Sequence, residues 1–133
     1  MDFTSDTGVY CLVVQLLQRS RIRIGRLGTF YFQAGFYVYV GSAQSSLKRR
    51  IERHQRQKKR IYWHIDYLLR YGRIVSVYMY AGEKDKECML SHKIGAMENA
   101  AVAVKGFGSS DCSCNSHLYF FSNEPDPGIF ARF

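Results

Sequence analysis

The feature that most constrains this chain is a strand-like segment leading directly into a basic segment, FYVYVGSAQSSLKRRIERH at residues 36–54. Aromatic and β-branched residues alternate up to Gly41, which predicts a strand with valines on one face and tyrosines on the other. Ser45 and Ser46 are favourable helix N-caps, so a helix is expected to begin there. The sequence therefore predicts a buried strand followed at once by a strongly basic helix.

The same periodicities predict the other elements of the chain. Apolar and alternating patterns indicate strands at 8–17, 36–41, 75–80 and 117–121, a hairpin at 22–32, and helices from 45 to 60, 62–71 and 85–97. The early strands follow one another directly, which favours an α+β fold with a small central mixed or antiparallel sheet, flanking helices and an inserted hairpin. We expect one domain over residues 1–122 and a loosely ordered or docking tail at 123–133, where both prolines lie.

Positive charge is concentrated in one segment. Residues 48–60 contain eight Lys or Arg and one acid, so they carry +7 of the net charge of +8. This density is typical of proteins that bind phosphate-bearing partners such as DNA or RNA. The alternative is a solvated helix face. The candidate nucleic-acid contacts are Lys48, Arg49, Arg53, Arg56, Lys58, Lys59 and Arg60.

Membrane and secretory roles are not indicated. The N-terminal MDFTSDTG lacks the basic and apolar regions of a signal peptide, and the longest apolar run, VYCLVV at 9–14, is too short to cross a bilayer. We therefore expect a cytoplasmic protein with no membrane partner and with reduced cysteines.

Two polar residues of the basic helix lie on its apolar stripe. Leu47, Arg50, Ile51 and His54 share one narrow arc at 100° per residue, so Arg50 and His54 are expected to face inward. A buried arginine needs an anion or a cleft, because an unpaired buried charge is very costly. The alternative is that the arginine extends past the sheet edge and the histidine is satisfied in the core.

Glu87 is placed in a similar way on a later helix, in the arc of Leu90, Ser91 and Ile94. Its carboxylate suits Mg²⁺ or Mn²⁺, although an acid in a first helical turn also stabilises the helix dipole without further purpose. An inward Arg, His and Glu that face sheet tyrosines form a set suited to phosphodiester cleavage. The tyrosines of that sheet face are Tyr10, Tyr37 and Tyr39.

Several short motifs resemble those of the GIY-YIG nuclease superfamily. GVY at 8–10 and YVG at 39–41 are similar to its two signature elements, and Leu47, Arg50 and His54 match the pattern that follows them. The resemblance covers residues 8–98 and implies Mg²⁺-dependent DNA hydrolysis on a compact α/β core. It implies catalytic roles for Tyr10, Tyr39, Arg50 and His54, with Tyr10 in water activation, Arg50 on phosphate and Glu87 on the metal. Gly41 is then expected to let a phosphate approach the backbone.

A closer resemblance comes from GFYVYVGSA, YWHIDYLL, ECML and GFGSSDCSCNSHLYF. These segments look like a compact prokaryotic subfamily of unknown function, whose members occur alone or fused to an endonuclease III-type glycosylase. That context implies DNA repair or processing, and a repair glycosylase as a partner. Two departures stand out: Tyr10 and Tyr39 are 29 residues apart instead of about ten, and the late active-site asparagine has no clear counterpart. Asn99, Asn115 and Asn123 are its candidates.

A second group of metal-ligating residue types lies near the C-terminus. Cys112, Cys114 and His117 fall within six residues, and Cys88 supplies a fourth ligand for a Cys₃His zinc site. Cys-x-Cys-x₂-His is not a standard zinc spacing. The alternative, which this spacing favours, is a turn with small buried cysteines.

The sequence leaves three functions open. The leading prediction is a DNA endonuclease that uses Mg²⁺ or Mn²⁺. The alternative is a nucleic-acid-binding module of the same fold that uses the basic helix 48–60 without catalysis. The third is an interaction domain stabilised by zinc around residues 112–117.

Overall fold

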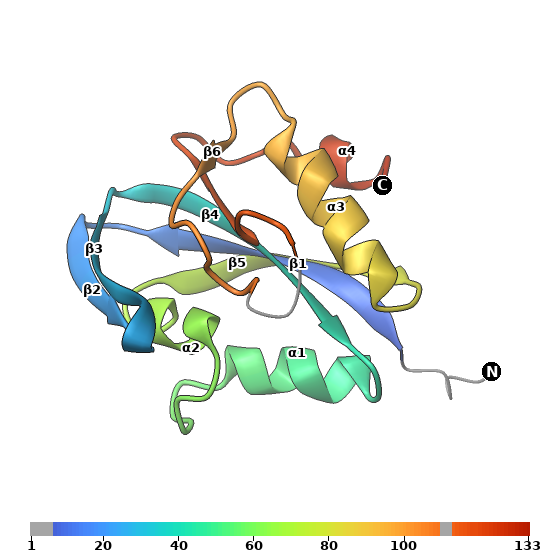
Figure 1. Ribbon diagram of the computed structural model, residues 1–133, viewed down its shortest axis with the longest axis horizontal. Coiled ribbons are helices and arrows are strands. Elements are labelled where there is room, and N and C mark those ends of the chain that lie inside the picture. The colour runs from blue at the N-terminus through green and yellow to red at the C-terminus, as the bar shows by residue number, and fades with distance from the viewer. Residues whose placement is uncertain (1–6, 110–112) are drawn as a thin grey trace.

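The fold is organised around a five-stranded antiparallel sheet (Figure 1). The computed structural model describes residues 7–109 and 113–133. The strand order is β5-β1-β4-β7-β6, so β4 is central and the first strand, β1, pairs with both β4 and β5. This confirms the predicted α+β class. The strands are β1 (Gly8–Leu16), β4 (Gly35–Ala43), β5 (Arg73–Ala81), β6 (Ala101–Val102) and β7 (Leu118–Phe121).

Helices cover both faces of this sheet. Helices α1 (Leu47–Gln55) and α2 (His64–Leu68) pack on one face, and α3 (Asp85–Gly95) and α4 (Pro127–Phe130) on the other. Alternation along β1 explains the two cores, because successive side chains of a strand point to opposite faces. Tyr10 and Leu12 join the core under α1 and α2, whereas Val9 and Cys11 join the core under α3 and α4.

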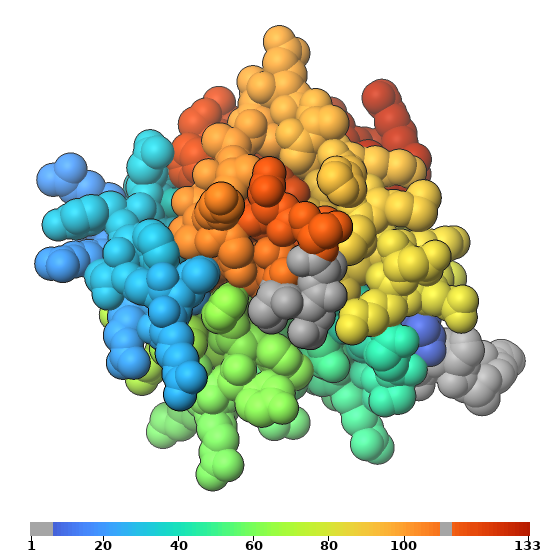
Figure 2. All heavy atoms as spheres, viewed as in Figure 1, coloured from blue at the N-terminus to red at the C-terminus, as the bar shows by residue number. Residues whose placement is uncertain are grey.

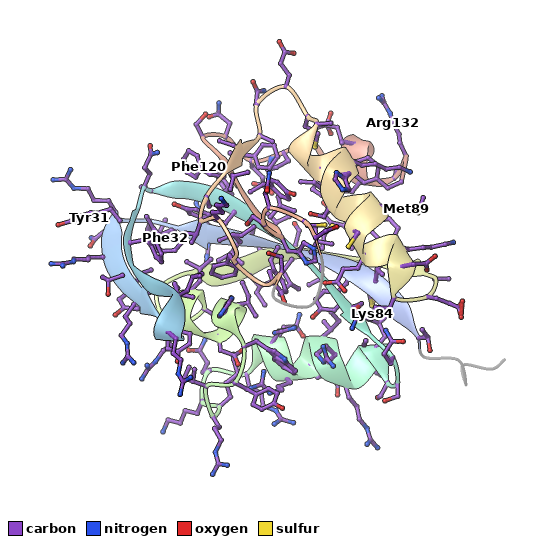
Figure 3. All side chains as sticks on the ribbon, viewed as in Figure 1. Tyr31, Phe32, Lys84, Met89, Phe120 and Arg132 are labelled. Carbon is purple, nitrogen blue, oxygen red and sulfur yellow. The ribbon has the colours of Figure 1, made fainter. Side chains whose placement is uncertain are left out.

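The predicted hairpin lies between β1 and β4. Strands β2 (Ser20–Ile24) and β3 (Gly28–Phe32) form a separate two-stranded sheet, joined by a short 3-10 helix. Figure 3 shows Tyr31 pointing outward from the hairpin and Phe32 inward, and their exposed fractions are 79% and 2%. The β1–β4 register is unbroken from Gly8 opposite Ala43 to Leu16 opposite Gly35. The long separation between the two tyrosine motifs is therefore an excursion that leaves their pairing unchanged.

The basic helix is shorter than predicted. It ends at Gln55, and Arg56 has extended backbone angles, so the expectation of a helix continuing to residue 60 is wrong. The apolar stripe stops at His54, and the position four residues later is a lysine with no core to pack against. The Lys59 ammonium donates to the carbonyl oxygens of His54 and Arg56 at the end of the helix. A cation at the negative end of the helix dipole stabilises this early termination.

Other helix ends also differ from the prediction. Ser46 does precede α1, but it has φ 50° and its side chain makes no capping hydrogen bond. Helix α3 begins at Asp85 as predicted, but it ends at Gly95 instead of residue 97. Helix α2 spans only His64–Leu68, and turns follow it to Tyr71.

The C-terminal segment docks on the core, which was one of the two expected alternatives. Asp126 caps α4 by accepting a hydrogen bond from the Gly128 N–H. Phe130 is 1% exposed and stacks on Tyr78 with ring centroids 4.2 Å apart. Tyr80 donates a hydrogen bond from its hydroxyl to the Phe130 carbonyl oxygen over 2.8 Å. Across the described residues, no helix combines the length and the apolar character needed to cross a bilayer.

Candidate functional site

A cleft of about 400 Å³ separates α1 and α2 from the start of α3. Its floor includes Tyr39 and Ser42 from β4, and its sides carry residues from all three helices and the loop before β7. Lys84, at the N-terminal end of α3, lines the cleft from the α3 side (Figure 3). The polar and aromatic side chains in the wall include Tyr39, Ser42, Arg50, Trp63, His64, Lys84 and Glu87. Two of the predicted catalytic residues and the predicted metal ligand thus meet in one cleft.

Arg50 lines this cleft from the α1 side. Its Nη1 donates to the Ser42 carbonyl oxygen over 2.9 Å, and its guanidinium carbon lies 4.4 Å from the centre of the Trp63 ring. A guanidinium has five N–H donors, so these contacts fix its position without using up its capacity for an anion. Of the two alternatives for Arg50, lining a cleft is the one observed.

Glu87 faces Arg50 across the cleft. One carboxylate oxygen accepts a hydrogen bond from the Ser42 hydroxyl over 2.7 Å, and the other lies 2.9 Å from His117 Nδ1. Burial raises the pKa of Glu87, but the hydrogen bonds from His117 and Ser42 outweigh burial and hold the pKa below its usual value. Glu87 is therefore a carboxylate at neutral pH, and more than a residue that stabilises the helix dipole.

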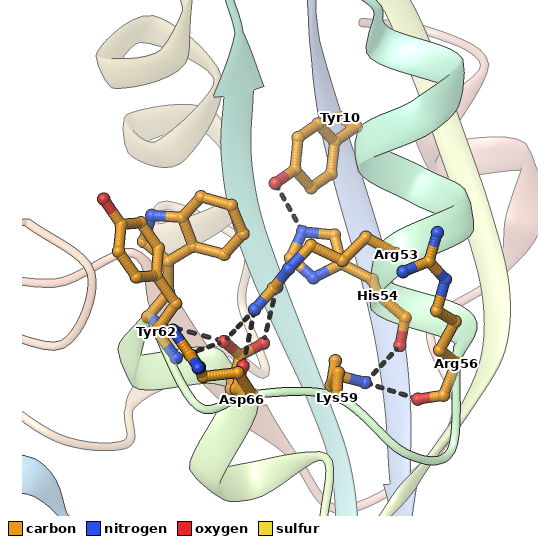
Figure 4. A network of polar contacts seen from close by, with 9 residues as sticks. Tyr10, Arg53, His54, Arg56, Lys59, Tyr62 and Asp66 are labelled. Carbon is orange, nitrogen blue, oxygen red and sulfur yellow. Dashed lines mark hydrogen bonds and ion pairs between the residues drawn. The ribbon is translucent and has the colours of Figure 1, made fainter.

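Tyr10 and His54 form a buried pair behind the cleft instead of lining it (Figure 4). The Tyr10 hydroxyl lies 2.7 Å from His54 Nε2, and both side chains are almost fully buried. Burial raises the pKa of Tyr10 to about 12 and lowers the pKa of His54 to about 4. Burial favours the uncharged form of both groups, so the pair stays neutral and the proton stays on the tyrosine.

The contact between Tyr10 and His54 requires a glycine at position 41. It lies directly opposite Tyr10 in the β1–β4 ladder, and a Cβ at Gly41 would lie 2.5 Å from the Tyr10 hydroxyl oxygen. The space over this glycine, where a phosphate was expected to approach, is taken by the Tyr10 ring. The expectation that Gly41 leaves the backbone uncovered is therefore wrong, and the glycine instead lets Tyr10 reach His54.

Arg53, one of the predicted nucleic-acid contacts, makes its contacts within the protein. Its guanidinium pairs with both carboxylate oxygens of Asp66 at 3.1 and 3.0 Å and stacks on Trp63 (Figure 4). The Asp66 side chain is fully buried and also accepts the backbone N–H groups of Tyr62 and Trp63. Burial raises the pKa of Asp66, but the Arg53 and backbone hydrogen bonds reverse that effect and lower it. Arg53 holds α1 to α2.

The other predicted nucleic-acid contacts divide by exposure. Lys59 is half-buried and bonded to carbonyl oxygens at the end of α1. Five basic side chains are exposed and available to a partner: Lys48, Arg49, Arg56, Lys58 and Arg60. Tyr62, which lines the cleft, is 73% exposed and adds an aromatic surface beside them.

Three of the four predicted zinc ligands converge. The ligand atoms of Cys88, Cys114 and His117 all lie within 4.8 Å of one another. Cys112, the remaining member of the predicted set, lies outside the described residues.

Several residues of the site were not predicted from the sequence. Ser42, His64 and Lys84 line the cleft. Asp66 does not line it but holds α2 to α1 through Arg53. Asp66 three residues after Trp63 has the spacing of an N-terminal capping pair, which was a usable signal. No asparagine belongs to the cleft lining among the described residues, so neither Asn99, Asn115 nor Asn123 is placed there.

The cleft has the chemistry to hold one hard divalent cation. Glu87 presents an ionised carboxylate, and each of its oxygens keeps a second lone pair beyond the contacts to Ser42 and His117. Mg²⁺ is commonly bound through one or two carboxylates, with water and substrate phosphate as the other ligands. The donor set therefore fits Mg²⁺ or Mn²⁺, with Glu87 as the protein ligand.

Comparison with known proteins gives one match. The sequence pattern of the family described as "Domain of unknown function DUF123" matches residues 9–130. No curated protein and no solved structure matches the chain.

Proposed function

The chain belongs to the DUF123 domain family, and from the geometry of its cleft we propose that it is a metal-dependent DNA endonuclease of the GIY-YIG type. The observation that carries the proposal is the convergence of Arg50, Glu87 and Tyr39 on one cleft beside exposed basic residues. An arginine, a carboxylate and hydroxyl groups are the side chains that phosphodiester hydrolysis needs. Arginine and metal stabilise the negative charge of the transition state.

Arg50 binds the scissile phosphate in this proposal. Its position on Trp63 and Ser42 is fixed before substrate arrives, so little of its conformational entropy is lost on binding. Lys84, on the opposite side of the cleft, adds a second cation. Together they neutralise a phosphate whose negative charge increases in the transition state.

Glu87 holds the divalent cation, which supplies Lewis acidity to the phosphate when bound. Ser42 and His117 orient the carboxylate through its two oxygens. Tyr39 contributes the cleft floor, and the Tyr10–His54 pair packs against its ring with centroids 6.3 Å away. Tyr10 thus positions Tyr39 from behind, because a fully buried phenol with a raised pKa is poorly placed to activate water directly.

The exposed residues of the basic segment hold the DNA backbone beside the cleft, on its α1–α2 side. Each neutralised phosphate adds salt-dependent affinity through counterion release. Tyr62, exposed at the cleft, suits stacking on an unpaired base, which favours branched, nicked or single-stranded substrates. The resemblance to a subfamily whose members also occur fused to an endonuclease III-type glycosylase supports a role in DNA repair or processing, with a repair glycosylase as a partner.

A second candidate is a nucleic-acid-binding module without catalysis, with RNA as well as DNA as its ligand. The observation that favours it is that Tyr10, the residue implied for water activation, is buried away from the cleft. In this function the exposed lysines and arginines carry the binding, and Glu87 contributes nothing to affinity.

The two candidates separate in one set of cleavage and binding assays. Purified protein is incubated with branched, nicked, abasic and single-stranded DNA in Mg²⁺ or Mn²⁺, and binding is measured on the same substrates. We expect metal-dependent cleavage that falls at least about 100-fold in Arg50→Ala, from loss of roughly 3 kcal/mol of transition-state stabilisation. The matched control is Arg49→Ala, which removes an exposed arginine next to it in sequence. Binding without cleavage of any substrate would leave the binding module as the function.

A further inference from the structure

We propose that Cys88, Cys114 and His117 bind one Zn²⁺ ion, separate from the cation at Glu87, and that this ion fixes the Glu87 carboxylate in the cleft. Their ligand atoms lie within 4.8 Å of one another. Sulfur and nitrogen ligands on a tetrahedron around zinc lie about 3.5–3.8 Å apart. A contraction of about 1 Å therefore turns the observed cluster into a zinc-coordinating one.

The chemistry of the cluster selects a soft metal ion. Two thiolates and one imidazole are poor ligands for Mg²⁺ or Mn²⁺, which prefer oxygen, and good ligands for Zn²⁺. Glu87 has the opposite preference. Two sites of different ligand softness thus lie side by side, and the two metal ions would not compete for the same place.

His117 is already oriented as a metal-bound histidine is. Its Nδ1 lies 2.9 Å from a Glu87 carboxylate oxygen, which is the contact that the second ring nitrogen makes when Nε2 binds a metal. Metal-bound histidines commonly donate their second ring nitrogen to a carboxylate, which fixes the ring and strengthens its basicity. The backbone is held as well: the His117 N–H donates to the Phe107 carbonyl oxygen, and its carbonyl oxygen accepts the Val40 N–H.

The ligands come from two segments that are distant in the sequence. Cys88 lies on α3, while Cys114 and His117 lie in the segment before β7, which reaches the surface beside α3 in Figure 2. A buried hydrogen bond from the Ser91 hydroxyl to the Ser116 carbonyl oxygen already joins these segments. Zinc would add a second link next to the residue that holds the catalytic cation. Its structural effect is to keep His117, and through it Glu87, in place.

The competing arrangement is a disulfide between Cys88 and Cys114. A disulfide would use both sulfurs and leave His117 with no metal to bind. The two arrangements make opposite predictions for metal content and for thiol chemistry.

The direct test is metal analysis of the full chain. Protein produced in zinc-supplemented minimal medium and purified without chelator is expected to contain one zinc ion per chain. Replacement by cobalt should give the thiolate-to-cobalt charge-transfer band and the intense visible bands of tetrahedral Co²⁺. Both cysteines should resist alkylation until a chelator is added. Metal-free protein with a Cys88–Cys114 disulfide, or cobalt spectra without thiolate bands, would overturn the proposal.

Variants localise the site. Cys88→Ser, Cys114→Ser and His117→Gln should each lose most of the zinc, whereas Cys11→Ser should keep it, because Cys11 lies in the sheet core outside the cluster. Zinc content unchanged in the three ligand variants would contradict the assignment. If a variant does not fold, chelator competition and cobalt spectra of the unaltered protein decide the question.

The zinc site does not depend on the proposed nuclease activity. Zinc stoichiometry and cobalt spectra report on the cluster whether or not the protein cleaves DNA. If cleavage fails while zinc is bound, the proposed function is lost and the zinc site remains. If cleavage succeeds in zinc-free protein at the same rate, the zinc is not needed to position Glu87.

Discussion

The two walls of the cleft hold their buried polar groups in different ways. On the α1–α2 wall, Asp66 accepts two hydrogen bonds from Arg53 and two from backbone N–H groups, so the charge is satisfied by the chain itself. On the α3–β7 wall, Glu87 keeps capacity for a cation, and two cysteines and a histidine converge beside it. The first wall is complete as protein, and the second is the wall where we propose that metal ions bind.

Some buried charged residues stabilise the fold, and others remain available for chemistry. Asp66, at 0% exposure, and Arg53 serve the packing of two helices, although both belong to segments rich in charge. Glu87 and Arg50 face the cleft and have donor or acceptor capacity to spare. Variants of Asp66 and Arg53 should therefore change stability, and variants of Glu87 and Arg50 should change chemistry more than stability.

The largest expected effect on stability comes from Asp66→Ala. It leaves Arg53 without its partner and orphans the N–H groups of Tyr62 and Trp63, so we expect a loss of about 3–5 kcal/mol in the free energy of unfolding. Urea denaturation measures it, with exposed Glu52→Ala as the control. If Asp66→Ala loses no more stability than Glu52→Ala, then Asp66 does not stabilise the packing of α1 against α2.

The next effect is a pH dependence that originates at His54. Its pKa is about 4 in the folded protein and about 6.5 when unfolded, so the unfolded state binds the proton first as pH falls. Stability is fully present above pH 6.5 and should decrease by roughly 3 kcal/mol between pH 7 and pH 4. The groups that face His54 and act on it are Tyr10, Arg50, Arg53, Lys59 and Asp66.

Urea denaturation at a series of pH values measures this decrease, and the difference between wild type and His54→Gln isolates it from the other histidines. A difference that is flat between pH 7 and pH 4 would show that His54 is not buried in its neutral form. Asp66 contributes in a lower window, because its pKa is depressed and its stabilisation is lost only as pH falls through that lowered value.

A smaller loss of stability is expected for Gly41→Ala. An added Cβ meets the Tyr10 hydroxyl at 2.5 Å, so Gly41→Ala must displace Tyr10 from His54 and should cost about 2 kcal/mol. Gly128→Ala is the matched control, since its added Cβ lies no closer than 3.5 Å to any neighbour. Thermal denaturation of both variants compares them, and equal melting temperatures would place the Tyr10 ring elsewhere.

The smallest effects are expected on DNA binding, when single exposed lysines or arginines are neutralised. Neutralising Lys48, Arg56 or Lys58 should each lower the salt dependence of DNA binding by about 0.9 in the slope of log K against log salt. Arg53→Gln should reduce stability instead, because its guanidinium is held by Asp66. Fluorescence anisotropy at several salt concentrations measures the slope. If none of the three exposed variants changes it, DNA does not contact this basic segment.

Much of this arrangement could be predicted from the sequence. Helical spacing alone placed Arg50 and His54 on the inward face of α1, and strand alternation placed Tyr10 and Tyr39 on the same sheet face as these helices. Periodicity reports which face of an element a residue occupies. It does not report which residue of another element it meets.

The predictions that were wrong concern residues whose roles depend on contacts with other segments of the chain. Arg53 was expected to contact nucleic acid as part of the basic segment, but its guanidinium pairs with the buried Asp66, thirteen residues away. Gly41 was assigned to phosphate approach, whereas its partner across the β1–β4 ladder decides its role. The helix end at Gln55 is stabilised by the Lys59 ammonium, which donates to the carbonyl oxygens of His54 and Arg56, and the sequence analysis did not consider this contact.

The measurement that tests the central claim most directly is single-turnover cleavage of branched DNA by Glu87→Gln in Mn²⁺. Substitution to glutamine keeps the size of the side chain and removes the charge that holds the cation. We expect cleavage at least about 100-fold slower than wild type with DNA affinity unchanged, and exposed Glu98→Gln as active as wild type. Equal cleavage by Glu87→Gln and wild type, or no cleavage by wild type, would contradict the assignment of the cleft to metal-dependent phosphodiester hydrolysis.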